Sequence, residues 1–135
     1  MVRAWGSQTA ARANPLRDML ASGAACGGGT DVIPYDPLLS IWSAVTRRIR
    51  TGDVLGAAQA LTPRQALWLH TLGAAALTGE ERLKGSLEVG KVADITVLSH
   101  DVLAMPADEI RRTRALMTVV GGVVAYDQLG ATPAA

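Results

Sequence analysis

Phenylalanine is absent from this 135-residue sequence, and its only aromatic side chains are three Trp and two Tyr. The hydrophobic core must therefore be built from Ala, Val, Leu and Ile, with Trp5, Trp42 and Trp68 as its only very large members. Hydrophobic residues still make up 49% of the chain and charged residues 19%. This composition is typical of a globular protein and argues against disorder.

The sequence also lacks an excess of either charge, a second cysteine and any long apolar run. Its 13 basic and 12 acidic residues leave a net charge of +1, which gives no electrostatic reason to expect nucleic acid or an anionic membrane as a partner. Cys26 is alone, so no internal disulfide can form and nothing indicates secretion. No apolar run approaches the ~20 residues that span a bilayer. The first residues lack the apolar core of a signal peptide and resemble a transit peptide only weakly, so we expect a cytoplasmic protein.

Three helices are predicted between residues 14 and 79. The first, at 14–23, has Pro15 after a capping Asn14. The second, at 37–52, has Asp36 as its cap and ends in three arginines, as expected at the negative end of a helix dipole. The third, at 62–79, opens with a capping box. Between the first two, the short run "AACGG" at 24–28 predicts a buried strand.

Strand signals dominate after Gly85. The run "DITVL" at 94–98 predicts a strand, and "PADEIRRT" at 106–113 predicts a short capped helix. The segment "ALMTVVGGVVAYD" predicts two strands joined by a tight turn at Gly121-Gly122. These signals divide the chain into a disordered N-terminus at 1–13, a helical part at 14–84, a β part at 85–127 and a disordered tail at 128–135.

The strand at 24–28 has no obvious partner, because a parallel strand needs neighbours on its ladder and the other predicted strands come much later. The chain therefore looks like the tail of something larger. The residue of interest is Asp31, which follows three glycines and a threonine. From the residues alone it is a turn residue, a helix cap, or a carboxylate held at the end of a buried strand.

Four segments in this order resemble the C-terminal part of the metal-dependent amidohydrolases, and above all the subgroup called amidohydrolase 3 or YtcJ-like. They are "NPLRDMLASGAACGGGTDVIPYDPLLSIWSAVTRR", "ALTPRQALWLHTLGAAALTGEE", "LKGSLEVGKVADITVLSHDVL" and "VVGGVVAY". The resemblance implies an α/β fold in which 14–84 supply the last strand and helices of a (β/α)8 TIM barrel. Residues 85–127 would then be part of a small composite β-sandwich.

The same resemblance implies a role for Asp31, which would sit at the C-terminal end of the last barrel strand, where barrel enzymes keep their catalytic groups. There it would bind a divalent metal, expected to be zinc, and act as a catalytic proton acceptor. The implied activity is hydrolysis of a carbon–nitrogen bond, other than a peptide bond, in a small-molecule amide or cyclic amide.

The chain departs from the family pattern in its ligands. It has no H-x-H pair, and its only histidines are His70 in a helix and His100 after a strand, for which we expect packing or loop roles. One aspartate cannot hold a catalytic zinc, which needs three or more protein ligands. We therefore expect the isolated chain to bind metal poorly and to hydrolyse nothing. The alternative is a non-catalytic remnant or interaction module that docks on a partner supplying the rest of the barrel.

The remaining candidate residues have structural interpretations. We expect Asp36 to cap a helix, Asp94 to tie a turn, and Cys26 to be a small buried residue rather than a nucleophile. Arg47 is expected to lie at a solvated helix end, or alternatively to help bind an acidic substrate. An incomplete barrel exposes a strand edge and apolar helix faces, so the sequence also predicts self-association or a complementary chain.

Overall fold

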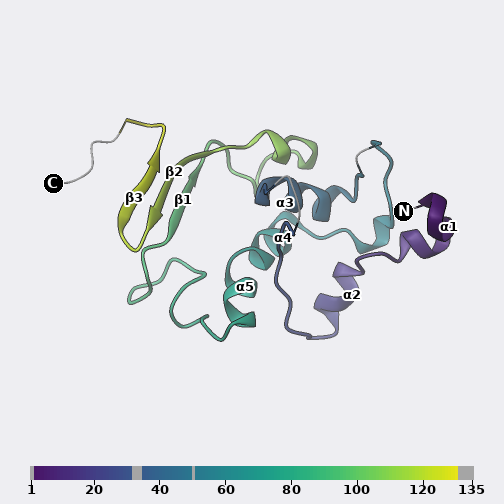
Figure 1. Ribbon diagram of the computed structural model, residues 1–135, viewed down its shortest axis with the longest axis horizontal. Helices are drawn as coiled ribbons and strands as arrows, with labels where there is room; N and C mark the ends of the chain where they lie inside the picture. Colours follow the sequence, from purple (N-terminus) through teal and green to yellow (C-terminus); the bar gives the residue numbers. More distant parts are fainter. Residues whose placement is uncertain (1, 32–34, 50, 131–135) are drawn as a thin grey trace.

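The computed structural model describes residues 2–31, 35–49 and 51–130 and has helices and a small sheet arranged side by side (Figure 1). In chain order the elements are α1 (Val2–Ala11), α2 (Leu16–Ala21), α3 (Pro37–Thr46), the 3₁₀ helix η1 (Ala57–Gln59), α4 (Pro63–Leu69), α5 (Leu72–Leu77), β1 (Ile95–Leu98), the 3₁₀ helix η2 (Ala107–Arg112), β2 (Ala115–Val120) and β3 (Val123–Asp127). The α/β class is as predicted. Over the described ranges, no helix has both the length and the apolar character needed to cross a bilayer.

The N-terminal segment differs from the expectation of disorder over 1–13, because residues 2–11 form α1 with a kink at Gly6. Contacts distant in sequence hold the end of this segment. A Cβ on Gly56 would lie 2.2 Å from the carbonyl oxygen of Ala11, and Ala10 is fully buried. Such contacts leave no local sequence signal. Of the predicted tail at 128–135, residues 131–135 lie outside the described chain.

The helix caps predicted at Asp36 and Thr62 are confirmed, because both side chains form the expected hydrogen bonds. The Asp36 carboxylate accepts a 2.9 Å hydrogen bond from the amide of Leu38 at the start of α3. At α4, Thr62 Oγ1 accepts from the amide of Gln65 at 3.2 Å, and Gln65 Oε1 accepts from the amide of Thr62 at 2.9 Å. These are the two reciprocal bonds of a capping box. The cap predicted at Asn14 is not formed, since Pro15 occupies that position at α2.

Helix α3 ends at Thr46 instead of running on to residue 52. Arg47 adopts a left-handed backbone conformation with φ 55°, and its amide donates to the carbonyl of Ser43. The chain then turns back, so that Arg48 forms an isolated antiparallel bridge with Val54. The predicted helix at 62–79 is likewise divided into α4 and α5, which meet at residues 70 and 71.

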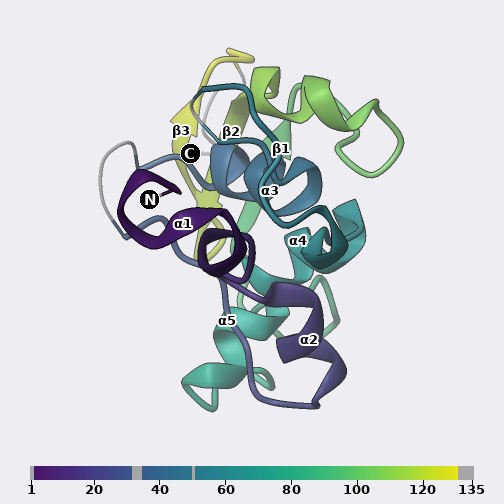
Figure 2. The ribbon, with the colours of Figure 1, turned by 90° about the vertical axis from the view of Figure 1, so that its right-hand side faces the viewer.

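The core lies where α3, α4 and η2 meet. Figure 2 shows α4 beside α3, with the segment that carries η2 above them. Ile110 of η2 is fully buried, and Ile41 and Trp42 of α3 are 2% and 8% exposed. Trp42 is thus a core residue as predicted. Trp68 is 37% exposed, so the prediction that it is a core residue was wrong. The side chain of Trp5 lies outside the described part of the chain.

Strands β1, β2 and β3 form an antiparallel sheet in that order, and the predicted turn at Gly121-Gly122 is confirmed by positive φ angles of 57° and 84°. Helices α1 to α5 lie to one side of this sheet rather than across it (Figure 1). The register pairs apolar side chains on one face: Ile95 with Val119, Val97 with Met117, and Val119 with Val124. Val97 is 37% exposed, so this face is only partly covered.

Residues 24–28 form neither a helix nor a strand, so the strand predicted there is wrong for this chain. The amide of Gly28 in this segment donates to the carbonyl of Leu69 at 2.7 Å. A strand requires a neighbouring ladder, and the sheet at 95–127 is built without this segment.

Candidate functional site

The segment that leads to Asp31 is pressed against α4 and α5. A Cβ on Gly27 would lie 2.5 Å from Cδ1 of Leu77 and 3.0 Å from Cα of Ala74. From the other side, a Cβ on Gly73 would lie 2.7 Å from the carbonyl oxygen of Cys26. Gly27 and Gly73 are therefore required by the close approach of the segment to the helices. The cause of this requirement in the structure is the packing of α4 and α5 against the segment.

The next residue, Gly28, lies on the side chain of His70 at the end of α4. A Cβ on Gly28 would lie 2.7 Å from His70 Nε2, which is itself 3.0 Å from Ser40 Oγ of α3. Because burial disfavours the imidazolium form, the pKa of His70 is lowered from its ordinary value. His70 thus has the packing role predicted for it, and it connects the glycine segment to two helices.

Asp31 itself is exposed at the end of this segment, with a left-handed φ of 55°. A left-handed aspartate is uncommon but tolerated, and it is typical of a sharp change in chain direction. The described chain continues at Tyr35, and Asp36 then caps α3. Asp31 thus lies between two anchored residues, Gly28, which is held by α4, and Asp36, which is held by α3.

A cavity of about 410 Å³ lies next to this loop, between the glycine segment and α3. Thr30, Ser40, Ser43 and His70 line it with polar groups. Arg47 also lines it, although its side chain is only 8% exposed.

Arg47 does not belong to a solvated helix end, and this expectation was wrong. Its Nε donates to the carbonyl of Leu55 at 3.1 Å, and its terminal nitrogens donate to the carbonyls of Asn14 and Ala13 at 3.2 and 2.8 Å. Burial lowers its pKa from the ordinary value. Two of these bonds hold the backbone before α2 and the third holds the chain at Leu55, so Arg47 serves the fold. The left-handed turn after Thr46, which aims the side chain inward, leaves no signal that the sequence could have shown.

The described residues place no complete set of metal ligands around Asp31. Within the part of the chain that is described, no group of three or more His, Cys, Asp and Glu side chains could hold a metal ion. His100 is exposed after β1, where its Nδ1 is 2.8 Å from Ser99 Oγ. The residues present therefore do not fit a complete metal centre.

Two further residues have the structural roles expected of them. Asp94 accepts a 2.8 Å hydrogen bond from the amide of Gly121, which ties the turn before β1 to the β2–β3 turn. Cys26 is a free thiol that is 8% exposed and packs in the core cluster.

Comparisons with known proteins agree on one family. The family model described as "Amidohydrolase family" matches residues 1–126. An N-substituted formamide deformylase from Arthrobacter pascens is 33% identical over 118 residues, which cover 86% of this chain and 22% of that protein. The putative amidohydrolase YtcJ of Bacillus subtilis (strain 168) is 32% identical over 117 residues, covering 83% of this chain and 22% of that protein.

A third relative has a different named activity. The 5-methylthioadenosine/S-adenosylhomocysteine deaminase of Symbiobacterium thermophilum is 31% identical over 124 residues, which cover 84% of this chain and 28% of that protein. No solved structure matches the chain at a comparable level. The chain thus spans between about a fifth and about three tenths of the length of these curated relatives.

Proposed function

Because this chain belongs to the amidohydrolase family, we propose that it forms the C-terminal part of a hydrolase that cleaves a carbon–nitrogen bond other than a peptide bond. The observation that carries the proposal is the match over residues 1–126 to a family whose relatives include a deformylase and a deaminase. Formamides and amino-substituted rings share a carbon–nitrogen bond that water can cleave. The proposed substrate is therefore a small molecule with an amide or amidine-like carbon.

In this proposal residues 24–28, which form no strand in the chain alone, become the last strand of a barrel when the rest of the barrel pairs with them, and α3 to α5 pack outside it. The contact of this segment with α4 and α5 along one side supports the placement. A barrel strand is covered by helices on its outer side and pairs with strands at both edges. The ladder partners that residues 24–28 lack among the described strands would come from other parts of the barrel.

Asp31 then lies at the carboxyl end of that strand, at the mouth of the barrel. We assign it as one carboxylate of a divalent metal centre, expected to be zinc, whose other ligands lie outside the described residues. Its exposure and its fixed loop ends support this role, since a ligand must be accessible and held in place. The chain alone is expected to bind metal weakly.

A segment swap tests the proposal. The part of the Arthrobacter pascens deformylase that aligns with this chain is replaced by residues 1–126, and hydrolysis of an N-substituted formamide is measured together with bound zinc. The swapped enzyme should retain activity. Asp31→Asn in the swapped enzyme should lower kcat by about 100-fold or more, because a carboxylate that moves protons is worth that much.

Asp36→Asn is the matched control, five residues further along the same loop. Asparagine caps a helix about as well as aspartate, so this variant should leave kcat nearly unchanged. The role of Asp31 is refuted if the swapped enzyme folds and turns over while Asp31→Asn and Asp36→Asn behave alike. An inactive swapped enzyme that folds and holds its zinc would favour the alternative below.

The alternative is a non-catalytic module that docks on a partner supplying the rest of the barrel. The partly covered apolar face of the sheet favours it, since such faces mark interaction surfaces. Calorimetry with zinc separates the two for the chain alone. Tight binding that Asp31→Asn abolishes would mean that copies of this chain assemble a metal site themselves, which would count against a purely structural module.

A further inference from the structure

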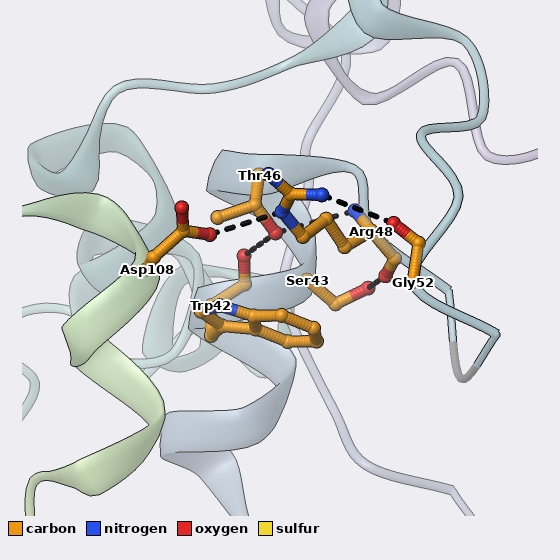
Figure 3. Close-up of polar contacts among 6 residues, drawn as sticks. All are labelled: Trp42, Ser43, Thr46, Arg48, Gly52 and Asp108. Atoms are coloured by element: carbon orange, nitrogen blue, oxygen red, sulfur yellow. Dashed lines mark hydrogen bonds and ion pairs between the residues drawn. The ribbon is translucent and has the colours of Figure 1, made fainter.

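A second cavity, of about 750 Å³, lies at the C-terminal end of α3, where Arg48, Ile49 and Gly52 and the helix η2 meet α3. Its lining residues come from these three elements: Leu39, Trp42, Ser43, Arg48, Ile49, Gly52, Asp108 and Arg111. Figure 3 shows the polar contacts at this place, with Arg48 between Asp108 and Gly52, above the indole of Trp42. A volume of this size is in the range of small-molecule sites.

The charges on the cavity walls do not balance. Arg48 Nε is 3.0 Å from a carboxylate oxygen of Asp108, and Arg48 also donates to the carbonyl of Gly52 at 3.0 Å. The one acidic side chain of the cavity is therefore already paired. Arg111 lies with its guanidinium carbon 5.3 Å from the centre of the Trp42 ring, and it forms no ion pair with any described carboxylate. Two cations against one anion leave one positive charge facing the cavity.

The floor of the cavity is apolar, and one of its side chains also carries an unsatisfied buried donor. Leu39, Trp42 and Ile49 supply hydrocarbon and indole surface. The indole nitrogen of Trp42 is buried and has no hydrogen-bond acceptor among the described residues. An unsatisfied buried donor is unusual in a native protein and calls for an acceptor. Arg111 is exposed and stacked on the ring, so its movement would change access to the indole.

We propose that this cavity binds a small organic carboxylate with an aromatic or branched aliphatic body. The carboxylate pairs with Arg111, whose planar guanidinium suits two oxygen atoms, and the body lies on Leu39, Trp42 and Ile49. A small hydrated anion such as phosphate would leave the apolar floor without a partner, and a cation would meet the excess positive charge.

This site is separate from the proposed metal centre and does not depend on it. Asp36 caps the N-terminal end of α3, whereas Arg48 and Ile49 follow its C-terminal end, and the two cavities share only the lining residues Leu39 and Ser43. The ten residues of α3 span roughly 15 Å. Binding at this cavity can therefore be measured on the chain without metal, and its failure would leave the proposed hydrolase function untouched.

Benzoate is the probe, and equilibrium dialysis against the full chain is the measurement, with Trp fluorescence as a second readout. Saturable binding is expected with a Kd of about 1 mM or tighter. Benzamide has the same shape without the charge and should bind at least about tenfold more weakly. Because the contact is electrostatic and exposed, high salt should also weaken benzoate binding.

Arg111→Gln removes the charge and should weaken benzoate binding by at least about tenfold. Arg112→Gln is the matched control, because Arg112 is the next residue, is paired with Glu109 and is not part of the cavity lining; it should change the Kd by less than about twofold. Circular dichroism checks that both variants are folded. No saturable benzoate binding, equal binding of benzamide, or equal effects of the two substitutions would each overturn the proposal.

Discussion

The backbone of Gly28 lies so close to the imidazole of His70 that no larger residue fits at position 28. A Cβ on Gly28 would lie 2.7 Å from Nε2 of His70. The imidazole occupies the space where that side chain would be, and it is fixed there by a 3.0 Å contact with Ser40 Oγ. The segment that leads to Asp31 is thus positioned by a ring on α4 that is bound in turn to α3. The contact between Gly28 and His70 thus connects the packing of α3 and α4 to the position of the candidate site.

Replacing Gly28 with alanine should therefore destabilise the chain by about 1 to 3 kcal/mol, the usual cost of overpacking. His70 must move, and its contact with Ser40 is then disturbed. Gly29→Ala is the matched control, since a Cβ on Gly29 would meet no atom within 4 Å and that residue does not need a positive φ. Urea denaturation measures both. Equal effects of the two substitutions would mean that Gly28 is not closely packed in solution.

Arg47→Met should cost about 3 kcal/mol or more of the free energy of unfolding. The substitution leaves the carbonyls of Ala13, Asn14 and Leu55 without their charged donor in a poorly hydrated place. Arg64→Met is the control, because Arg64 is exposed in α4. Thermal and urea melts compare the variants, and a cost for Arg47→Met no greater than for Arg64→Met would contradict the buried role.

The sequence predicted what is encoded locally. The caps at Asp36 and Thr62 and the turn at Gly121-Gly122 depend on neighbouring residues, and the structure has all of them. Arg47 and residues 24–28 depend on contacts distant in sequence. The left-handed turn that buries Arg47 is adopted against its local preference, and a strand at 24–28 requires a ladder that the described strands do not provide.

The candidate site likewise combines features that the local sequence indicates with features that depend on contacts distant in sequence. Asp31 was singled out by its place after the glycines and by the family resemblance, and it stays a prediction. His70 was expected only to pack, and its link to Gly28 and Ser40 required coordinates. The cavity beside Trp42 combines side chains about 70 residues apart, Leu39 and Arg111, so no local pattern indicates it.

Thr62→Ala should reduce stability by about 1 kcal/mol, because it removes one side of the capping box at α4. Thr62→Asn keeps an acceptor at the cap and should restore most of that loss. Chemical denaturation of the three proteins measures the effect. Loss of the same stability in both variants would show that the methyl and hydroxyl packing of Thr62, rather than its cap, is important.

Self-association through the partly covered face of the sheet is the next expectation. Val97 lies on this face opposite Met117 and is 37% exposed, so Val97→Lys should shift the chain toward smaller species in sedimentation velocity. Val89→Lys is the control, because Val89 is fully exposed outside the sheet. A chain that is monomeric and melts cooperatively without any substitution would refute this expectation.

The free energy of unfolding of the chain should decrease as the pH is lowered, because His70 titrates. Burial lowers the pKa of this imidazole below its ordinary value of 6.5, so the unfolded chain takes up a proton at a higher pH than the folded chain does. Between the two pKa values the unfolded state binds more protons, and the free energy of unfolding therefore decreases as the pH falls below 6.5. Glu80 and Glu88 have pKa values lowered from 4.5, so their contributions are lost only in more acidic solution.

Urea melts at pH about 7.5 and about 5.5 should show this loss of stability in the parent chain and in His100→Gln, whose histidine is exposed. His70→Gln should lower stability at both pH values but remove most of the difference between them. An unchanged difference in His70→Gln would mean that another group titrates, and that His70 is not held neutral against Gly28.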